Sequence, residues 1–169
     1  MYDQATTEYI VNMASFLLER TTKLNTTIDK AWQFFSNPRN LEKITPASMQ
    51  FKVKTTDLPE EIYSGMFIAY KVSPLVGIPV NWVTKITDVS KPFYFADEQE
   101  SGPYTYWRHE HLFTENGIYT IMKDKVNYTM PFGIIGSAVH SLLVKNRLKQ
   151  IFDYRTKIIT ENFPGSIAL

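Results

Sequence analysis

Residues 104–130 read YTYWRHEHLFTENGIYTIMKDKVNYTM and carry a strong local signal for the fold. Apolar and polar side chains alternate on both sides of Asn116-Gly117, and a period of two is typical of a strand with one buried face. Both central residues of a type I′ turn need positive φ, which asparagine and glycine tolerate. The stretch therefore predicts a β-hairpin with strands at 104–114 and 118–130.

The same alternation continues on the N-terminal side of this hairpin, as far back as Met49. Turn residues recur at intervals of about ten positions, which is the spacing expected of an antiparallel meander. We therefore expect further strands before the hairpin, at residues 48–56, 65–73, 79–89 and 93–100.

Two short helices are predicted to separate this meander from an N-terminal strand. Residues 14–24 mix apolar residues with threonine, which is typical of a strand. Thr26 or Thr27 can then cap a helix at 28–36. A second short helix is expected at 38–44, because its first residue is a proline, which is favoured in a first helical turn.

After Pro131 the period of the apolar residues changes from that of a strand to that of a helix. One stripe recurs at helical spacing, so we expect a helix of about 25 residues at 135–159, roughly 38 Å long. Its members are Ile135, Val139, Leu142, Leu143, Leu148, Ile151, Phe152, Arg155 and Ile159. A twisted sheet of about six or seven strands has one face to bury, and a single helix covers only its centre. The predicted fold class is therefore α+β, with a curved antiparallel sheet wrapped around the C-terminal helix and space between them.

The composition is that of one globular domain. Of the 169 residues, 44% are hydrophobic and 21% are charged, which is close to ordinary globular usage. Residues 1–12 are polar and lack periodicity, so we expect a disordered or appended leader, followed by a single domain at 13–163.

Charge and cysteine content argue against several classes of function. Eighteen Lys and Arg against seventeen Asp and Glu give a net charge of +1, which provides no field to attract a nucleic acid. The chain contains no cysteine, which excludes disulfides and thiolate chemistry and suits a reducing cytoplasm. The most membrane-like segment, 131–144, is too short to span a bilayer and contains His140, so we expect no stable membrane insertion.

The stretches that match a known family lie throughout the chain. They are AWQFF at 31–35, NLEKITP at 40–46, WVTKI at 82–86, FADEQ at 95–99, GPY at 102–104, WRHEHLF at 107–113 and DKVNY at 124–128. With this order of elements, residues 14–160 resemble the START-like or SRPBCC superfamily, and most closely its bacterial ligand-binding members known as polyketide cyclase/dehydrase-like proteins. The resemblance implies a helix-grip fold with an internal cavity, in a superfamily that includes both binding proteins and enzymes.

Aromatic residues make up 14% of the chain and are concentrated between positions 93 and 113. Because side chains on a strand alternate between faces, parity predicts which of them share the interior. The interior faces are expected to carry Phe93, Phe95, Asp97 and Gln99, then Trp107, His109, His111 and Phe113, then Met122, Asp124, Val126 and Tyr128. Two histidines, two aspartates and a glutamine are therefore expected to meet inside an apolar shell.

Three interpretations of this polar cluster are open. Buried polar groups are usually paired, so Asp97 or Asp124 could orient a histidine and hold the register of the sheet. The cluster could also form the polar end of an aromatic-lined ligand cavity, and a histidine beside a carboxylate could act there as general acid or base. A His-x-His pair could ligate a metal, but it is a weak signature beside the spaced zinc motifs, so we expect no metal and no cofactor.

The cluster and the resemblance together predict binding of a small hydrophobic or aromatic molecule, lipid-like or polyketide-like, between the sheet and the C-terminal helix. Binding is favoured over catalysis, because the sequence has no phosphate loop, dinucleotide fingerprint or nucleophile elbow. The alternatives are a cyclase or hydratase that uses His109, His111, Asp124 or Asp97 as acid and base, and an interaction protein without a ligand. The residues expected to bind the ligand are Tyr70, Trp82, Phe95, Gln99, Trp107, His109, His111, Asp124, Tyr128 and Leu142.

Overall fold

The computed structural model describes residues 15–73, 77–131 and 143–169. Its strands are β1 (Ser15–Leu24), β2 (Lys52–Val53), β3 (Phe67–Val72), β4 (Val80–Ser90), β5 (Tyr94–Ser101), β6 (Tyr106–Asn116), β7 (Tyr119–Thr129) and β8 (Ile167–Ala168). They form one sheet of eight strands in the order β2-β3-β4-β5-β6-β7-β1-β8. Every pair of neighbours is antiparallel, so the predicted α+β fold class is confirmed.

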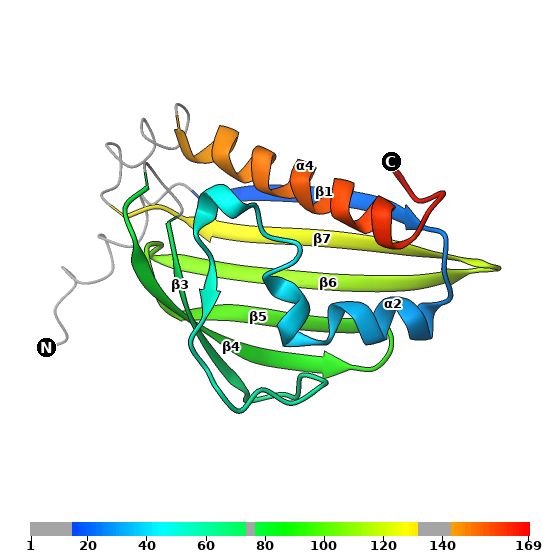
Figure 1. The fold of residues 1–169 in the computed structure, drawn as a ribbon, viewed down its shortest axis with the longest axis horizontal. Coiled ribbons are helices and arrows are strands. Elements are labelled where there is room, and N and C mark those ends of the chain that lie inside the picture. Colours follow the sequence, from blue (N-terminus) through cyan, green and yellow to red (C-terminus); the bar gives the residue numbers. More distant parts are fainter. Residues whose placement is uncertain (1–14, 74–76, 132–142) are drawn as a thin grey trace, which may run out of the picture.

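Two α-helices of the described residues cover one face of this sheet (Figure 1). The shorter helix, α2 (Ile28–Phe35), buries Ile28, Ala31 and Trp32. The longer helix, α4 (Lys145–Asn162), packs along β1. It ends three residues beyond the end predicted at Ile159, and positions 135–142 of the predicted helix lie outside the described residues. No helix in the described part of the chain is long and apolar enough to span a membrane.

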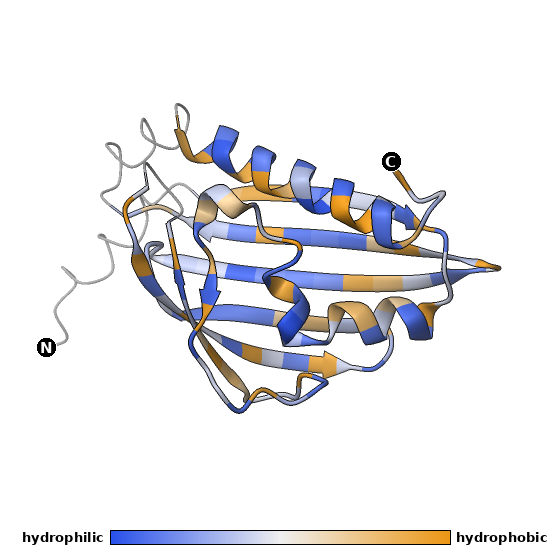
Figure 2. Ribbon diagram, in the orientation of Figure 1, coloured by the Kyte–Doolittle hydropathy of each residue, from blue (hydrophilic) through white to orange (hydrophobic). Residues whose placement is uncertain are grey.

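Two apolar clusters pack between the helices and the sheet. Under α2, the Trp32 ring meets the edges of Phe95 and Phe113, with ring centroids 5.8 and 6.2 Å apart. Under α4, Leu148 and Phe152 pack with buried residues of the sheet. Apolar and polar bands alternate along the strands (Figure 2), which is the pattern that gives the sheet one buried and one solvated face.

The segment between α2 and β3 differs from the prediction. The strand expected at 48–56 is limited to Lys52–Val53, because a 3₁₀-helix, η2 (Ala47–Met49), occupies its beginning. Gln50 follows this helix with a φ of 48°, a left-handed conformation that breaks the extended backbone of a strand. The second helix expected at 38–44 is a shorter 3₁₀-helix, η1 (Pro38–Leu41).

Two further details of the sheet were not predicted. Strand β8 pairs with Thr22 and Lys23 of β1 and gives the sheet its eighth strand. Phe93, assigned by parity to the interior, is 54% exposed, because β5 begins only at Tyr94 and the alternation of faces does not extend to the turn before it. The remaining interior assignments on β6 and β7 follow the observed burial pattern.

Candidate functional site

The register of three neighbouring strands brings the polar cluster together. Asp97 of β5 is opposite His109 of β6, and His111 of β6 is opposite Asp124 of β7. Both histidines and Asp124 are more than 90% buried. Residues directly opposite each other on adjacent strands have neighbouring side chains, so the pairing of the sheet itself assembles the group.

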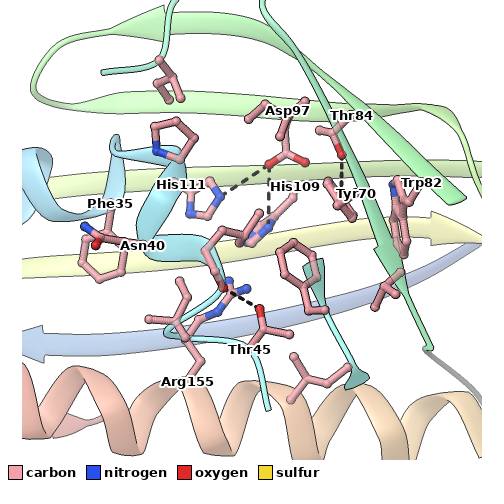
Figure 3. Close-up of a pocket in the computed structure, with 18 of the residues that line it drawn as sticks. Phe35, Asn40, Thr45, Tyr70, Trp82, Thr84, Asp97, His109, His111 and Arg155 are labelled. Carbon is pink, nitrogen blue, oxygen red and sulfur yellow. Dashed lines mark hydrogen bonds and ion pairs between the residues drawn. The ribbon is translucent and has the colours of Figure 1, made fainter. Parts of the chain in front are cut away.

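Each of the two carboxylates lies beside both imidazoles. Asp124 Oδ1 is 2.9 Å from His109 Nε2 and 3.1 Å from His111 Nδ1. Asp97 Oδ2 lies on the other side, 3.9 Å from His109 Nδ1 and 3.6 Å from His111 Nε2, as Figure 3 shows. Because an ionised carboxylate can only accept hydrogen bonds, the Nε2–H of His109 donates to Asp124.

The electrostatics of the cluster shift the pKa values of the two histidines in opposite directions. Burial alone would raise the pKa of Asp124, but the hydrogen bond from His109 and the adjacent imidazole of His111 hold it far below its usual range. Burial opposes the charged form of His111, yet the adjacent Asp124 and Asp97 raise its pKa overall. Burial and the neighbouring His111 lower the pKa of His109. Within the cluster, Asp124 therefore favours its ionised form, and His111 holds a proton more readily than His109 does.

A fourth charged group, Arg155, reaches the cluster from helix α4. Its Nη1 is 3.9 Å from Asp124 Oδ1, and its guanidinium lies 4.9 Å from the centroid of the Phe152 ring. The side chain is only 9% exposed. The sequence placed Arg155 in the stripe of the C-terminal helix, and its position beside the polar cluster was not predicted. A single arginine within an apolar stripe is the signal that could have identified it.

The cluster forms part of the wall of a cavity between the sheet and α4. Its volume is about 160 Å³. Most of the wall is aromatic or aliphatic, and its charged or titratable groups in the described chain are Asp97, His109, His111, Tyr70, Tyr104 and Arg155. Of the residues predicted from the sequence, those that line the cavity are Tyr70, Trp82, Phe95, Asp97, Trp107, His109 and His111.

Aromatic rings build two sides of this cavity. The rings of Phe95 and His111 are stacked, with centroids 4.0 Å apart, so the imidazole is flanked by an apolar surface. Trp82 meets the edge of Trp107, with ring centroids 5.2 Å apart. Burial and the nearby Asp97 raise the pKa of Tyr70, and its hydroxyl is hydrogen-bonded to Thr84. Tyr70 is therefore a neutral part of the wall.

Other predicted residues have positions behind or beside the cavity wall. Asp124 does not line the cavity but contacts both histidines, which do. Gln99 Nε2 donates to the carbonyl of Tyr104 over 2.7 Å, and the backbone N–H of Tyr104 donates to Gln99 Oε1 over 3.2 Å, so this side chain closes the β5–β6 turn. Tyr128 packs among aromatic rings of β1 and β6. Leu142 lies outside the described residues.

The connection between α2 and β3 supplies further lining residues that the sequence did not identify. They include Asn40, Ile44, Thr45, Met49 and Phe51. Several belong to 3₁₀-helices and turns, where neither helical nor strand periodicity shows which side chain faces inward. The matching stretch at 40–46 marked this segment, although its side-chain directions could not be assigned from a pattern.

Three of the cluster residues have the chemistry to hold a metal ion. One ligand atom from each of Asp97, His109 and His111 lies within 4.8 Å of the others. A metal with bonds of about 2.1 Å holds neighbouring ligand atoms within roughly 3.5 Å of each other. Asp97 Oδ2 lies 3.6 Å from His111 Nε2 and 3.9 Å from His109 Nδ1. The side chains would have to move closer together, beside the positive charge of Arg155.

We therefore expect protein purified without an affinity tag to contain zinc, iron, nickel and copper well below one ion per chain. Adding these metals should leave the melting temperature unchanged, because ion binding must first displace the existing contacts among Asp97, His109 and His111. Elemental analysis and thermal melts check this. One equivalent of metal that disappears in His109→Ala and His111→Ala would establish a metal site instead.

Comparison with known proteins gives similarity of structure only. No family model matches the chain, and no curated protein matches its sequence. Norcoclaurine synthase from Thalictrum flavum, solved in complex with dopamine and hydroxybenzaldehyde, has a TM-score of 0.65 at 13% identity, covering 95% of each chain. Major latex-like protein 151 from Panax ginseng has a TM-score of 0.64 at 13% identity, covering 89% of this chain and 98% of its own.

A bacterial structure is similar to the same extent. Protein Ms6760 from Mycobacterium smegmatis has a TM-score of 0.60 at 20% identity, covering 86% of this chain and 92% of its own. All three neighbours belong to the SRPBCC and Bet v1 group, and the order and arrangement of their elements match the sheet, the short helices and α4. The chain therefore has the helix-grip fold of the SRPBCC and Bet v1 proteins.

Proposed function

We propose that this protein binds a small, largely apolar molecule in the cavity between the sheet and α4. The observation that carries the proposal is an aromatic-lined space with a few convergent polar groups on its wall, the usual composition of a small-molecule site. The fold supports the proposal, because helix-grip neighbours include a protein solved with small aromatic molecules bound.

The size of the cavity favours a compact ligand with a single ring. A volume of about 160 Å³ is close to that of an engineered cavity of about 150 Å³ that holds benzene. It is smaller than the cavities of roughly 300–1,000 Å³ that receive drug-sized ligands. Among the ligands expected from the sequence, a small aromatic compound therefore fits this space better than a long-chain lipid.

Native mass spectrometry of freshly purified protein tests the proposal. We expect an added mass of one small molecule per chain, which is lost on denaturation and can be extracted and identified. Ligand-observed NMR with toluene and substituted single-ring aromatics covers the case in which the bound molecule is lost on purification. A chain that retains no molecule and binds no member of this series would contradict the proposal.

One observation favours a second candidate, an acid/base enzyme of the cyclase or hydratase type. Two imidazoles with pKa values shifted in opposite directions line the same cavity, and such a pair can supply both a proton donor and a proton acceptor. The two candidates differ in one measurement. A binding protein returns the identified ligand unchanged, whereas an enzyme converts it and loses this turnover in His109→Ala or His111→Ala.

A further inference from the structure

The Arg155 guanidinium is buried, and its donors are largely unused. Its Nε is inaccessible to solvent and has no hydrogen-bond partner. Within residues 15–73, 77–131 and 143–169, no group accepts a hydrogen bond from this side chain, and its nearest carboxylate oxygen is 3.9 Å away. A guanidinium carries five N–H donors, and leaving donors unpaired in the interior costs free energy.

Asp124 cannot satisfy this arginine within its present contacts. The Oδ1 atom nearest to Arg155 is also the atom that lies 2.9 Å from His109 and 3.1 Å from His111. This carboxylate is therefore shared by three basic side chains. It compensates part of the charge of Arg155 without accepting a hydrogen bond from it.

The contacts of the two carboxylates point to a missing acceptor at Arg155. Asp97 and Asp124 both lie beside the two histidines, and neither accepts a hydrogen bond from the guanidinium. Figure 3 shows the histidine pair between Asp97 and Arg155, so an acceptor bound at Arg155 would be separated from Asp97 by the imidazoles. Arg155 is also the sole Lys or Arg among the described lining residues.

We propose that the ligand of this cavity carries a carboxylate, which binds the Arg155 guanidinium while its ring packs against the aromatic wall. This inference rests on the proposed function and adds the chemical class of the ligand. The planar guanidinium matches a carboxylate through two parallel N–H donors. The predicted ligand class is therefore a small carboxylic acid with a single ring.

Benzoate and its neutral analogue benzamide form the test pair, with toluene as the apolar reference. We expect benzoate to bind at about pH 7 with a Kd on the order of 1 mM or below. We expect benzamide to bind about tenfold more weakly, since a hydrogen bond to a charged acceptor is roughly twice as strong as a neutral one. Isothermal titration or ligand-observed NMR on the unaltered chain measures the ratio of the two dissociation constants without any variant.

Two variants on helix α4 assign the preference to Arg155. Arg155→Gln should reduce the difference in affinity between benzoate and benzamide to within about twofold. Glutamine keeps an N–H donor but loses the positive charge and the two parallel donors of the guanidinium. Arg155→Lys, which keeps the charge, should give an intermediate ratio. Lys157→Gln removes the same charge from the exposed side of the helix and should leave the ratio unchanged. Circular dichroism establishes that each variant is folded.

The outcomes separate the two proposals. Selective benzoate binding that is lost in Arg155→Gln supports both. Equal binding of benzoate, benzamide and toluene, or a benzoate preference that survives in Arg155→Gln, overturns the carboxylate inference and leaves the ligand cavity in place. Absence of binding by all three compounds, together with the absence of any co-purified molecule, overturns both.

Discussion

Replacing Asp124 with asparagine is expected to lower the free energy of unfolding by about 3–5 kcal/mol, the typical cost of removing one partner from a buried ionic group. The asparagine side chain would have the same shape but no charge to balance Arg155, which cannot release its proton. His111 can become neutral, but it would lose the nearer of its two carboxylates. The loss corresponds to a decrease in melting temperature of roughly 6–20 °C.

The matched control is Asp153→Asn on the outer side of α4. The Asp153 side chain is 50% exposed and pairs with Lys149 at the surface, so its replacement should change the free energy of unfolding by about 0.5 kcal/mol or less. Urea denaturation of the three proteins measures both effects. A loss below about 1 kcal/mol for Asp124→Asn would mean that the buried cluster tolerates neutralisation, contrary to its geometry.

The stability that Asp124 contributes should fall as the pH is lowered. The pKa of Asp124 is held below its ordinary value in the folded chain, so its contribution to stability is complete above the unfolded value of about 3.9 and is lost as the pH falls. The difference in stability between wild type and Asp124→Asn should therefore decrease below about pH 4. If the difference in free energy of unfolding between wild type and Asp124→Asn stays constant down to pH 3, within about 0.5 kcal/mol, then protonation of Asp124 does not contribute to the loss of stability in acid.

The hairpin explains why much of the polar cluster could be predicted. Once Asn116-Gly117 defines the turn, strand parity places His109, His111 and Asp124 on one buried face, and no long-range information is needed. The pairing of Asp97 with His109 follows from the next turn in the same way. Local periodicity therefore determines which side chains share the sheet's interior face.

Strand parity does not predict groups that reach the site from a helix, nor the hydrogen-bond partners of the strand residues. The position of Arg155 depends on how α4 is rotated and placed over the sheet, which is a property of tertiary packing. Gln99 has the correct parity, yet its amide bonds to the backbone of Tyr104, because a nearby turn offers both a donor and an acceptor. Sequence periodicity gives the face of a residue but not its hydrogen-bond partner.

The second large effect is expected from filling the cavity. Val72 of β3 lines it and is 3% exposed, so Val72→Trp would place an indole in the space that the ligand requires. We expect binding of benzoate and toluene to weaken by about 100-fold or more, equivalent to roughly 2.7 kcal/mol. Overpacking a filled core costs about 1–3 kcal/mol, but an indole that enters existing space should cost less than about 1 kcal/mol.

Lys71→Trp is the control for this variant, because position 71 is the exposed neighbour on the same strand and its side chain points to the other face of the sheet. It introduces the same indole and should leave binding unchanged. The combination of lost binding and retained stability in Val72→Trp is specific to a cavity, since a structural defect would reduce both. If Val72→Trp binds both compounds as the wild type does, the ligand lies elsewhere, and the aromatic wall around Trp82 and Trp107 serves packing alone.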